Sequence, residues 1–398
     1  MAKSQSSRAR SVLNWQNFAT LAPACIAAAV ALASCPARAQ TETVLYSFKG
    51  GTTDGKTPYA GVIRDNVGNL YGTTLYGGAH DKGTVIKLTK SGERLLHSFG
   101  GSPDGDSPLA GLIRDGAADV CGTTSAGGAY SMGTVFQVSS GGKETLSHSF
   151  AGAPTDGGVP LAGFIGDNNG NLYGTTGLGG ASNLGTVFKV DAASNETLLY
   201  SFTGVNGDGA GPSGGLVRDS QGNLYGTTEY GGLSTFGTVF KLDVNGKETV
   251  LYSFAGGTDG TIPEGSMVMD AAGNLYGATT YGGIAGAGTI FKVDPTGKET
   301  VLYTFEHPGD AAYPQGGLIR DKAGNLYGTA TAGGKDDFGA VFKFNIKTNV
   351  ETILHSFGAT GDGQVPNGPL AIDDHGNIYG ATEQGGASGF GTVFKIAP

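Results

Sequence analysis

A six-residue element, Asn-Leu-Tyr-Gly-Thr-Thr or a close variant of it, recurs seven times along the 398-residue chain. Its glycine returns at intervals of 50 to 52 residues, at Gly72, Gly122, Gly174, Gly226, Gly277, Gly328 and Gly380. A fixed period of this length is typical of one supersecondary unit copied in tandem. The repeat therefore constrains the fold more than any other feature of the sequence.

The fourth copy shows what one unit contains. Four short segments rich in β-branched and aromatic residues are predicted to be strands. They span residues 215–219, 223–228, 237–242 and 248–254. The turns Asp219-Ser-Gln-Gly222 and Asp243-Val-Asn-Gly246 each end in a glycine, which supplies the positive φ that such hairpin turns require. Each copy is therefore predicted to be an antiparallel four-stranded meander with apolar residues on both faces.

The phase of the first and last copies predicts closure into a ring. Glu42-Thr-Val-Leu-Tyr-Ser-Phe48 is a fourth strand without its preceding three, and Gly391-Thr-Val-Phe-Lys-Ile396 is a third strand without its fourth. If the first segment completes the last copy, the chain forms an all-β, seven-bladed β-propeller of four-stranded antiparallel blades, with its edges hidden. A solenoid of parallel coils is the alternative, but it would not need two hairpin turns per repeat and would usually have atypical capping repeats.

Residues 1–39 are predicted to be a signal peptide, followed by a propeller domain at 40–398. The leader contains basic residues and no acid, an apolar stretch from Leu21 to Ala33, and Ala37-Arg38-Ala39 as a cleavage pattern. The apolar stretch is too short for a transmembrane segment. The run that ends in Cys35 also resembles a lipobox, so lipidation of Cys35 is the alternative. A periplasmic or secreted protein is expected, or else a lipoprotein.

Net charge narrows the classes of possible partner, and cysteine content limits crosslinking. Without the leader the chain has 21 basic and 34 acidic residues, a formal charge of −13. Nucleic acids and anionic membranes bind basic surfaces, so neither is expected as a partner. Cys121 would be the only remaining cysteine, which excludes an internal disulfide.

The repeat also resembles a known family. The string Asp-Gly-x-x-Pro, Gly-Leu-Ile-Arg-Asp, Gly-Asn-Leu-Tyr-Gly-Thr-Thr, Gly-Gly and Gly-Thr-Val-Phe-Lys resembles the GloVer (Gloeo-Verruco) tandem repeat of bacterial choice-of-anchor exported proteins, over residues 42–396. It is distantly similar to repeats in the propellers of bacterial two-component sensors. The resemblance implies an extracytoplasmic location and no known activity. Such proteins often carry a C-terminal sorting anchor, for which residues 394–398 leave no room, so a secreted, periplasmic or Cys35-lipidated form is expected.

Ligand contacts are expected on the propeller face where the loops from the second to the third strand and from the fourth to the next first strand emerge. These are the longest loops in every copy. Their aromatic and charged side chains could stack on a sugar or anchor a protein partner, or the rings could simply pack over a blade edge. The candidate ligand-binding residues are Tyr76, Tyr130, Tyr230, Tyr281, Lys335, Asp336 and Asp337.

Two series of aspartates recur with the repeat. The first lies in the loop before each first strand, at Asp54, Asp104, Asp156, Asp208, Asp259, Asp310 and Asp362. A ring of calcium or polyol ligands is one interpretation, but calcium takes about six to eight oxygen ligands, so capping of the loop backbone is favoured. The second series opens the first hairpin turn and is predicted to be structural, at Asp65, Asp115, Asp167, Asp219, Asp270, Asp321 and Asp373.

No nucleophile and base, paired zinc histidines or phosphate-binding loop can be identified. His97, His148 and His355 replace a tyrosine of the fourth strand, so they are predicted to be strand residues and not bases. No catalytic residue, metal or cofactor is therefore predicted. The leading hypothesis is an exported, non-catalytic binding or scaffold module for a glycan or a protein. The alternatives are an extracytoplasmic lyase or glycoside hydrolase acting at the channel mouth, and a passive structural protein of the cell envelope.

Overall fold

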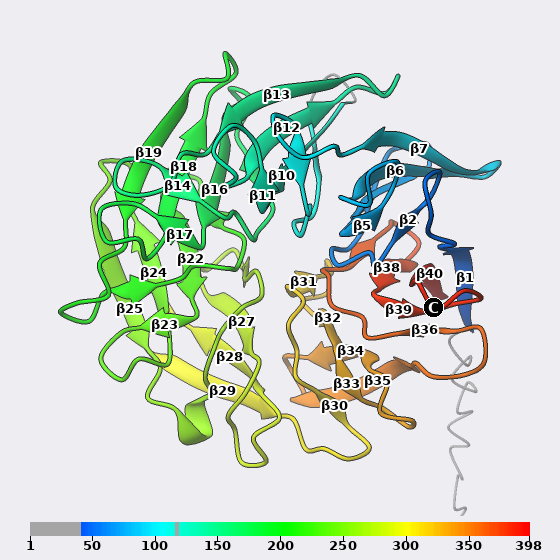
Figure 1. Ribbon diagram of the computed structural model, residues 1–398. Helices are drawn as coiled ribbons and strands as arrows, with labels where there is room; N and C mark the ends of the chain where they lie inside the picture. The colour runs from blue at the N-terminus through cyan, green and yellow to red at the C-terminus, as the bar shows by residue number, and fades with distance from the viewer. Residues whose placement is uncertain (1–40, 116–118) are drawn as a thin grey trace, which may run out of the picture. The chain divides into compact units, whose positions relative to one another are not determined.

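The computed structural model of the protein describes residues 41–115 and 119–398, so the predicted leader, residues 1–39, lies outside the described residues. Within those ranges the chain forms seven four-stranded antiparallel sheets arranged in a ring (Figure 1). The predicted seven-bladed β-propeller is therefore confirmed. No helix in the two described ranges is long and apolar enough to cross a membrane.

Each blade begins with a two-residue strand near the central channel and ends with a longer strand at the rim (Figure 1). Blade 1 contains β3 (Ile63–Arg64), β4 (Leu70–Thr74), β6 (Thr84–Thr89) and β7 (Gly92–Ser98). Blade 2 contains β9 (Ile113–Arg114), β10 (Val120–Thr124), β12 (Thr134–Val138) and β13 (Glu144–Ser149). Blade 3 contains β15 (Ile165–Gly166), β16 (Leu172–Thr176), β18 (Thr186–Val190) and β19 (Glu196–Ser201).

The second half of the ring repeats this order. Blade 4 contains β21 (Val217–Arg218), β22 (Leu224–Thr228), β24 (Thr238–Leu242) and β25 (Glu248–Ser253). Blade 5 contains β26 (Val268–Met269), β27 (Leu275–Thr279), β28 (Thr289–Val293) and β29 (Glu299–Thr304). Blade 6 contains β31 (Ile319–Arg320), β32 (Leu326–Ala330), β34 (Ala340–Asn345) and β35 (Val350–Ser356). Blade 7 contains β37 (Ala371–Ile372), β38 (Ile378–Thr382), β40 (Thr392–Ala397) and β1 (Thr41–Ser47).

The ring is closed by the first described strand. β1 pairs with β40 in antiparallel register from Thr41↔Ala397 to Ser47↔Thr392, so the N-terminal strand completes blade 7 as predicted. Figure 1 shows β1 in blue beside β40 in red. Phe48 follows this strand and is buried between blades 7 and 1. The propeller is therefore closed both by backbone hydrogen bonds and by the burial of an aromatic side chain.

The hairpin turns form by the predicted chemistry. In blade 4, Gly222 has a φ of 93°. Asp219 Oδ1 accepts hydrogen bonds from the backbone N–H groups of Gln221 and Asn223, both at 2.9 Å, and the Tyr225 hydroxyl donates to Oδ2 at 3.0 Å. Burial alone would raise the pKa of Asp219, but these bonds and one from the Asn223 side chain together lower it. The second aspartate series therefore fixes the turns.

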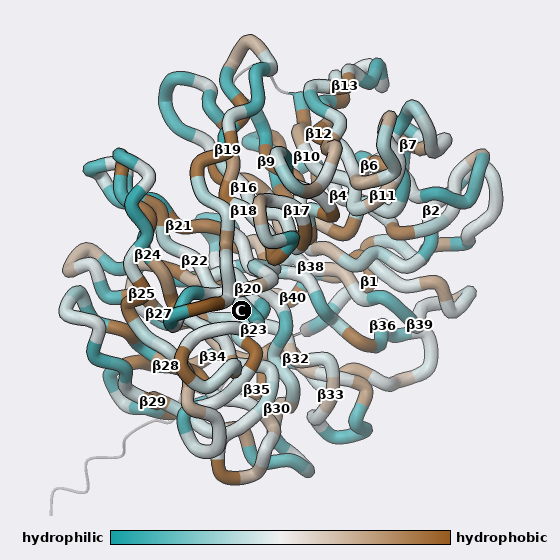
Figure 2. Tube along the Cα trace, turned by 60° about the vertical axis from the view of Figure 1, so that its left-hand side comes forward, coloured by the Kyte–Doolittle hydropathy of each residue, from teal (hydrophilic) through white to brown (hydrophobic). Residues whose placement is uncertain are grey.

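Adjacent blades share the hydrophobic core. Phe254, at the end of β25, packs edge-on against Phe291 of the next blade, with ring centroids 5.1 Å apart. Phe240 closes over the glycine of the repeated element within its own blade, because a Cβ added to Gly226 would lie 2.6 Å from Phe240 Cζ. Figure 2 shows apolar segments along the strands and polar segments at the loop tips. In six of the seven blades the glycine of the element thus leaves room for a phenylalanine ring, and blade 1 has Ile86 in its place.

Candidate functional site

Both predicted ligand-binding loops of a repeat emerge at the same end of the blade, because neighbouring strands of an antiparallel meander run in opposite directions. We call this end of the ring the loop-rich face. In six repeats the two loops pair as a two-stranded ribbon. The ribbons are β2 (Gly55–Lys56) with β5 (Tyr76–Gly77), β8 (Gly105–Asp106) with β11 (Ala126–Gly127), β14 (Gly157–Gly158) with β17 (Leu178–Gly179), β20 (Gly209–Ala210) with β23 (Tyr230–Gly231), β30 (Ala311–Ala312) with β33 (Ala332–Gly333), and β36 (Gly363–Gln364) with β39 (Gln384–Gly385). In the fifth repeat the turn η1 (Gly257–Asp259) precedes a single bridge from Thr261 to Tyr281.

The four tyrosines predicted to bind ligand are exposed, and they come from four different blades. Tyr76, Tyr230 and Tyr281 occupy equivalent positions after the second strand. Tyr281 packs against Tyr313 of the neighbouring loop, with ring centroids 5.4 Å apart. Tyr130 lies at a loop tip, which is a different position in the repeat. None of the four lines the central cavity described below.

The three charged candidates belong to one loop of blade 6. Asp337 Oδ1 accepts a hydrogen bond from the Gly333 backbone N–H at 2.8 Å, and Asp81 makes the same bond to Gly77 in blade 1. Asp337 therefore holds its own loop in shape. Lys335 and Asp336 are exposed on that loop.

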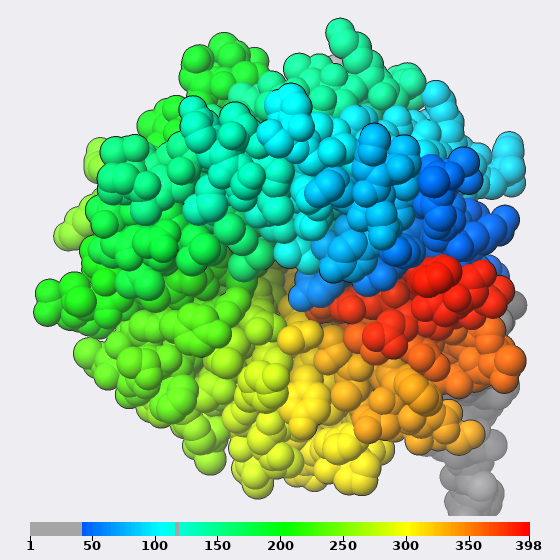
Figure 3. Space-filling view, viewed as in Figure 1, coloured from blue at the N-terminus to red at the C-terminus, as the bar shows by residue number. Residues whose placement is uncertain are grey.

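A cavity of about 370 Å³ lies where the blades meet at the centre of the ring (Figure 3). Every repeat contributes the residue that follows its loop proline to the cavity wall. We call these seven residues the mouth ring: Tyr59, Leu109, Leu161, Ser213, Glu264, Gln315 and Asn367.

Glycines next to the mouth ring set the width of the channel. A Cβ on Gly265 would lie 2.8 Å from the Gly316 carbonyl oxygen, and a Cβ on Gly316 would lie 2.8 Å from that of Gly368. Neighbouring blades therefore meet here backbone against backbone. This close approach leaves the larger side chains of the mouth ring to define the entrance.

The mouth ring differs in chemistry between its two sides. Blades 1 to 3 contribute an apolar arc, formed by Tyr59, Leu109 and Leu161. Blades 4 to 7 contribute a polar arc, formed by Ser213, Glu264, Gln315 and Asn367. Glu229, from the loop after the second strand of blade 4, adds another carboxylate to the wall.

Burial raises the pKa of carboxyl groups at and beside the polar arc. The Thr280 hydroxyl donates a hydrogen bond to Glu264 Oε2 at 3.1 Å. Burial, and then the nearby charge of Glu229, raise the pKa of Glu264. Asn367 Nδ2 donates to Glu383 Oε1 at 2.9 Å, and burial raises the pKa of Glu383. In the polar arc the Glu264 carboxylate is thus poorly hydrated, and it lies in the wall of the cavity.

The mouth ring was not among the residues predicted from the sequence. A signal was available, because the residue after the loop proline changes from Tyr to Leu, Ser, Glu, Gln and Asn between copies that otherwise share their turns and strands. Variation at one position of a nearly constant frame indicates a position that packing does not fix. The predicted ligand-binding residues all lie in the other loop, which follows the second strand.

The first aspartate series binds across the seams between blades. Asp208 Oδ2 accepts hydrogen bonds from the Tyr200 hydroxyl at 3.2 Å and the Thr203 backbone N–H at 2.7 Å, while Oδ1 accepts from the Gly209 N–H at 2.7 Å. The predicted capping of the loop backbone is confirmed, with an added bond to the fourth strand. The same bond joins Tyr46 to Asp54, His97 to Asp104, His148 to Asp156, Tyr252 to Asp259, Tyr303 to Asp310 and His355 to Asp362. The three histidines lie on β7, β13 and β35, as predicted.

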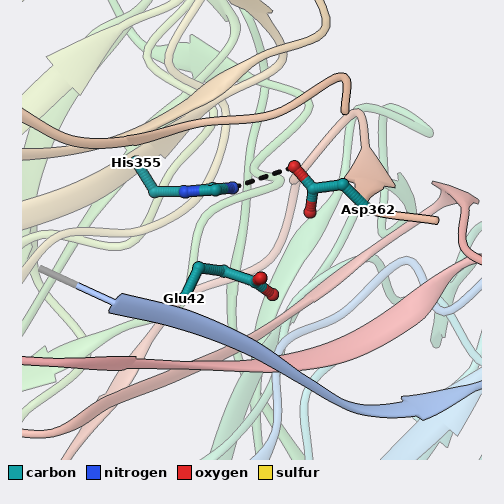
Figure 4. A group of neighbouring side chains, drawn as sticks. All are labelled: Glu42, His355 and Asp362. Carbon is teal, nitrogen blue, oxygen red and sulfur yellow. Dashed lines mark hydrogen bonds and ion pairs between the residues drawn. The ribbon is translucent and has the colours of Figure 1, made fainter. Parts of the chain in front are cut away.

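A glutamate of each rim strand lies beside this hydrogen-bonded pair. We call these residues the seam glutamates. Figure 4 shows Glu42 of β1 with its carboxylate beside the hydrogen-bonded pair of His355 and Asp362. The Oε1 atom of each seam glutamate is buried and has no hydrogen-bond partner within the described residues. These glutamates are Glu42, Glu93, Glu144, Glu196, Glu248, Glu299 and Glu351.

How far the pKa of a seam glutamate is raised depends on whether a tyrosine or a histidine binds the aspartate beside it. Burial, and then the charge of Asp310, raise the pKa of Glu351 to about 8. The same two causes, with Asp208 as the neighbour, raise the pKa of Glu248 to about 7. Burial and Asp362 also raise the pKa of Glu42, but there the charge of His355 opposes them. Tyrosine seams therefore favour the protonated glutamate more than histidine seams do.

Two histidine seams bring together groups that could hold a metal. The ligand atoms of Glu42, His355 and Asp362 lie within 4.8 Å of one another, as do those of a second group, His148, Asp156 and Glu196. One imidazole and two carboxylates could bind zinc. Four other seams make the same aspartate bond with tyrosine, so a structural role accounts for the arrangement in every blade.

The model of the Gloeobacter/Verrucomicrobia repeat matches residues 34–218 and 205–394, which together span most of the chain. The chain belongs to this family. The resemblance expected from the motif string is therefore confirmed. No curated protein matches the sequence of this Gloeobacter/Verrucomicrobia repeat protein.

Solved structures similar to this repeat protein are also propellers. One is the extracellular domain of a hybrid two-component system from B. thetaiotaomicron, with 12% identity and a TM-score of 0.58 over 90% of this chain and 41% of that one. Another is the extracellular domain of a one-component system from the same organism, with 11% identity and a TM-score of 0.55 over 89% of this chain and 40% of that one. The chain thus spans about two fifths of each. At this identity the similarity concerns the fold.

Proposed function

We propose that this protein is an exported, non-catalytic binding module whose ligand, a glycan or a segment of a protein, enters the cavity at the centre of the loop-rich face. The mouth ring is the observation that carries this proposal. Seven equivalent backbone positions present an apolar arc and a polar arc to one cavity. Ligand pockets commonly combine apolar walls with a few placed polar groups.

The exposed loop residues act as a second layer in this proposal. Tyr76, Tyr230 and Tyr281 stand at equivalent positions on the same face, so they can contact the outer part of a ligand too large for the cavity. Tyr130, Lys335 and Asp336 are exposed on neighbouring loops and can contribute in the same way. Asp337 would shape its loop through the bond from Gly333 to Oδ1, and its exposed carboxylate can contribute a ligand contact as well.

A ligand screen by thermal unfolding tests the proposal. A compound that binds only the folded state raises stability by RT ln(1 + [L]/Kd), or about 2.7 kcal/mol at 100 times Kd. We expect at least one saccharide or peptide of a panel to raise Tm, and the rise to vanish in Leu161→Ser and Asn367→Ser. Serine already occupies this position in blade 4, so both variants should fold. Val67→Ser, at an exposed residue of a hairpin turn that does not line the cavity, serves as the matched control. A panel without any shift would favour a passive structural protein.

A second candidate function follows from the two carboxylates in the cavity. Glycoside hydrolases use a pair of carboxyl groups, one of which has a raised pKa. Glu229 and Glu264 lie in one cavity, and burial and Glu229 raise the pKa of Glu264. The saccharide panel should therefore also be assayed for product. Turnover that disappears in Glu264→Gln would replace the binding proposal with this one.

Export is proposed on the sequence of residues 1–39, with cleavage after Ala39 or, in a lipoprotein, before Cys35. Strand β1 begins at Thr41, two residues after Ala39. Intact mass of the protein recovered outside the cytoplasm measures the outcome. We expect the mass of residues 40–398. A mass that begins at Cys35 with added acyl chains would support the lipoprotein, and the full-length mass would contradict export.

A further inference from the structure

The walls of the central cavity carry negative charge without a balancing cation. Glu229 and Glu264 are its acidic lining residues, and no lysine, arginine or histidine lines it within the part of the chain that the structure describes. Thr280 donates a hydrogen bond to Glu264 Oε2, but a hydroxyl does not neutralise a carboxylate. Carboxylates removed from water are stabilised when a cation pairs with them.

The mouth also presents apolar surface on the side opposite these carboxylates. Leu109 and Leu161 lie in consecutive blades, and Tyr59 extends this arc to blade 1. All three side chains are only partly buried, although they are hydrophobic or aromatic. Each of the three is followed in the wall by a small residue, Ala60, Ala110 or Ala162. An apolar body in the cavity would remove this surface from water.

The two arcs differ in what they can recognise. A bare divalent ion would use the carboxylates but gain nothing from Leu109 and Leu161. A neutral sugar would accept hydrogen bonds from Gln315 and Asn367, yet it would leave the charges of the carboxylates unpaired. A molecule that joins an ammonium group to a compact apolar body matches both arcs and fits a volume of about 370 Å³.

We infer that the mouth ring binds a small organic amine, with its ammonium group against Glu229 and Glu264 and its apolar body against Leu109 and Leu161. This inference rests on the proposed function, since it names the ligand class of the same site. The amine can be free or can be the amino group of a larger sugar or peptide, of which the rest lies over the exposed loop tyrosines.

Three probes of equal size and different charge test the inference by calorimetry on the intact protein. Benzylammonium, benzyl alcohol and benzoate share a phenyl ring, to which the first two add a methylene group. We expect benzylammonium to bind at least about tenfold more tightly than the other two, as expected for a hydrogen bond between charged partners. Glu264→Gln and Glu229→Gln should each weaken benzylammonium by about tenfold or more. Leu109→Ser should weaken all three probes, and Glu306→Gln, an exposed carboxylate outside the cavity, should change none.

The outcomes separate this inference from the proposed function. Equal affinity for the three probes, or amine binding unchanged in both glutamine variants, overturns the inference. Binding of calcium alone, lost in both glutamine variants, also overturns it. A neutral saccharide whose binding depends on Asn367 but not on the two glutamates overturns the amine and leaves the proposed binding function standing. If no probe or panel compound binds and mouth-ring substitutions change nothing, the proposed function itself fails.

Discussion

A chain from which residues 41–47 are deleted is expected to lose its cooperative thermal transition and to associate. The deletion removes the whole β1–β40 ladder, from Thr41↔Ala397 to Ser47↔Thr392. The edge of β40 would then present unpaired N–H and C=O groups, which invite pairing with another chain. Phe48, which is 1% exposed, would also lose the strand that holds it between blades. Circular dichroism during heating and size-exclusion chromatography measure the two effects.

A circular permutant tests whether the loss of the strand itself, and not the new N-terminus, causes these effects. In this control the chain begins at Lys49, runs to Pro398, and continues through an Asp-Val-Asn-Gly turn into residues 41–48. All ladder bonds remain, while the covalent order changes. We expect the permutant to melt cooperatively, close to the parent Tm. If the deletion variant melted at the parent Tm as a monomer, β1 would not be what closes the ring.

The stability of the propeller is expected to fall as pH rises from about 4 to about 8. Seam glutamates have a folded-state pKa above the unfolded value of about 4.3, so the folded state binds their protons more tightly. This contribution is complete below the unfolded pKa and is lost as pH rises through about 7 at Glu248 and about 8 at Glu351. The lowered pKa of the hairpin aspartates, such as Asp219, acts in the opposite direction, with stability lost below about pH 4. We therefore expect Tm to be highest at about pH 4 to 5, where the two windows meet.

Glu351→Gln isolates one seam. Glutamine keeps the shape of the side chain but cannot acquire the charge that faces Asp310, so it should raise Tm by about 2 °C at pH 8.5 and change it little at pH 5. The exposed Glu306→Gln should leave Tm unchanged at both values. Thermal melts across the pH range provide the comparison. A uniform effect of Glu351→Gln at every pH would show that the carboxyl acts by packing and not by titration.

The architecture was predictable because each blade is built from contacts close in sequence. Hairpin turns such as Asp219 to Gly222 fix their strands locally, and a segment that starts with Glu42 has no partner until blade 7 supplies one. First strands are shorter than predicted, since residues 215–219 yield only Val217–Arg218. Gly215 and Leu216 instead form part of the cavity wall, and Asp219 opens the hairpin turn.

The candidate site was predictable only in part, because it depends on contacts between blades. Glu351 is 41 positions from Asp310, and no local pattern indicates that they share a seam. The exposed tyrosines were selected by residue type alone. Tyr130 was therefore grouped with tyrosines that occupy another position of the repeat. Glu264 and Leu109 have no distinctive neighbours in sequence, and only the ring places them on one cavity.

The register of the closing ladder also determines how the protein would respond to mechanical load. Thr41 pairs with Ala397, so the two ends of the described fold lie at the same end of the β1–β40 ladder. Tension applied between the two ends would load the hydrogen bonds one after another, as in a zipper, and not all together in shear. Blade 7 would therefore open first under force, even though closure protects the same ladder against thermal unfolding. A ring held at one end only would bear no such tension.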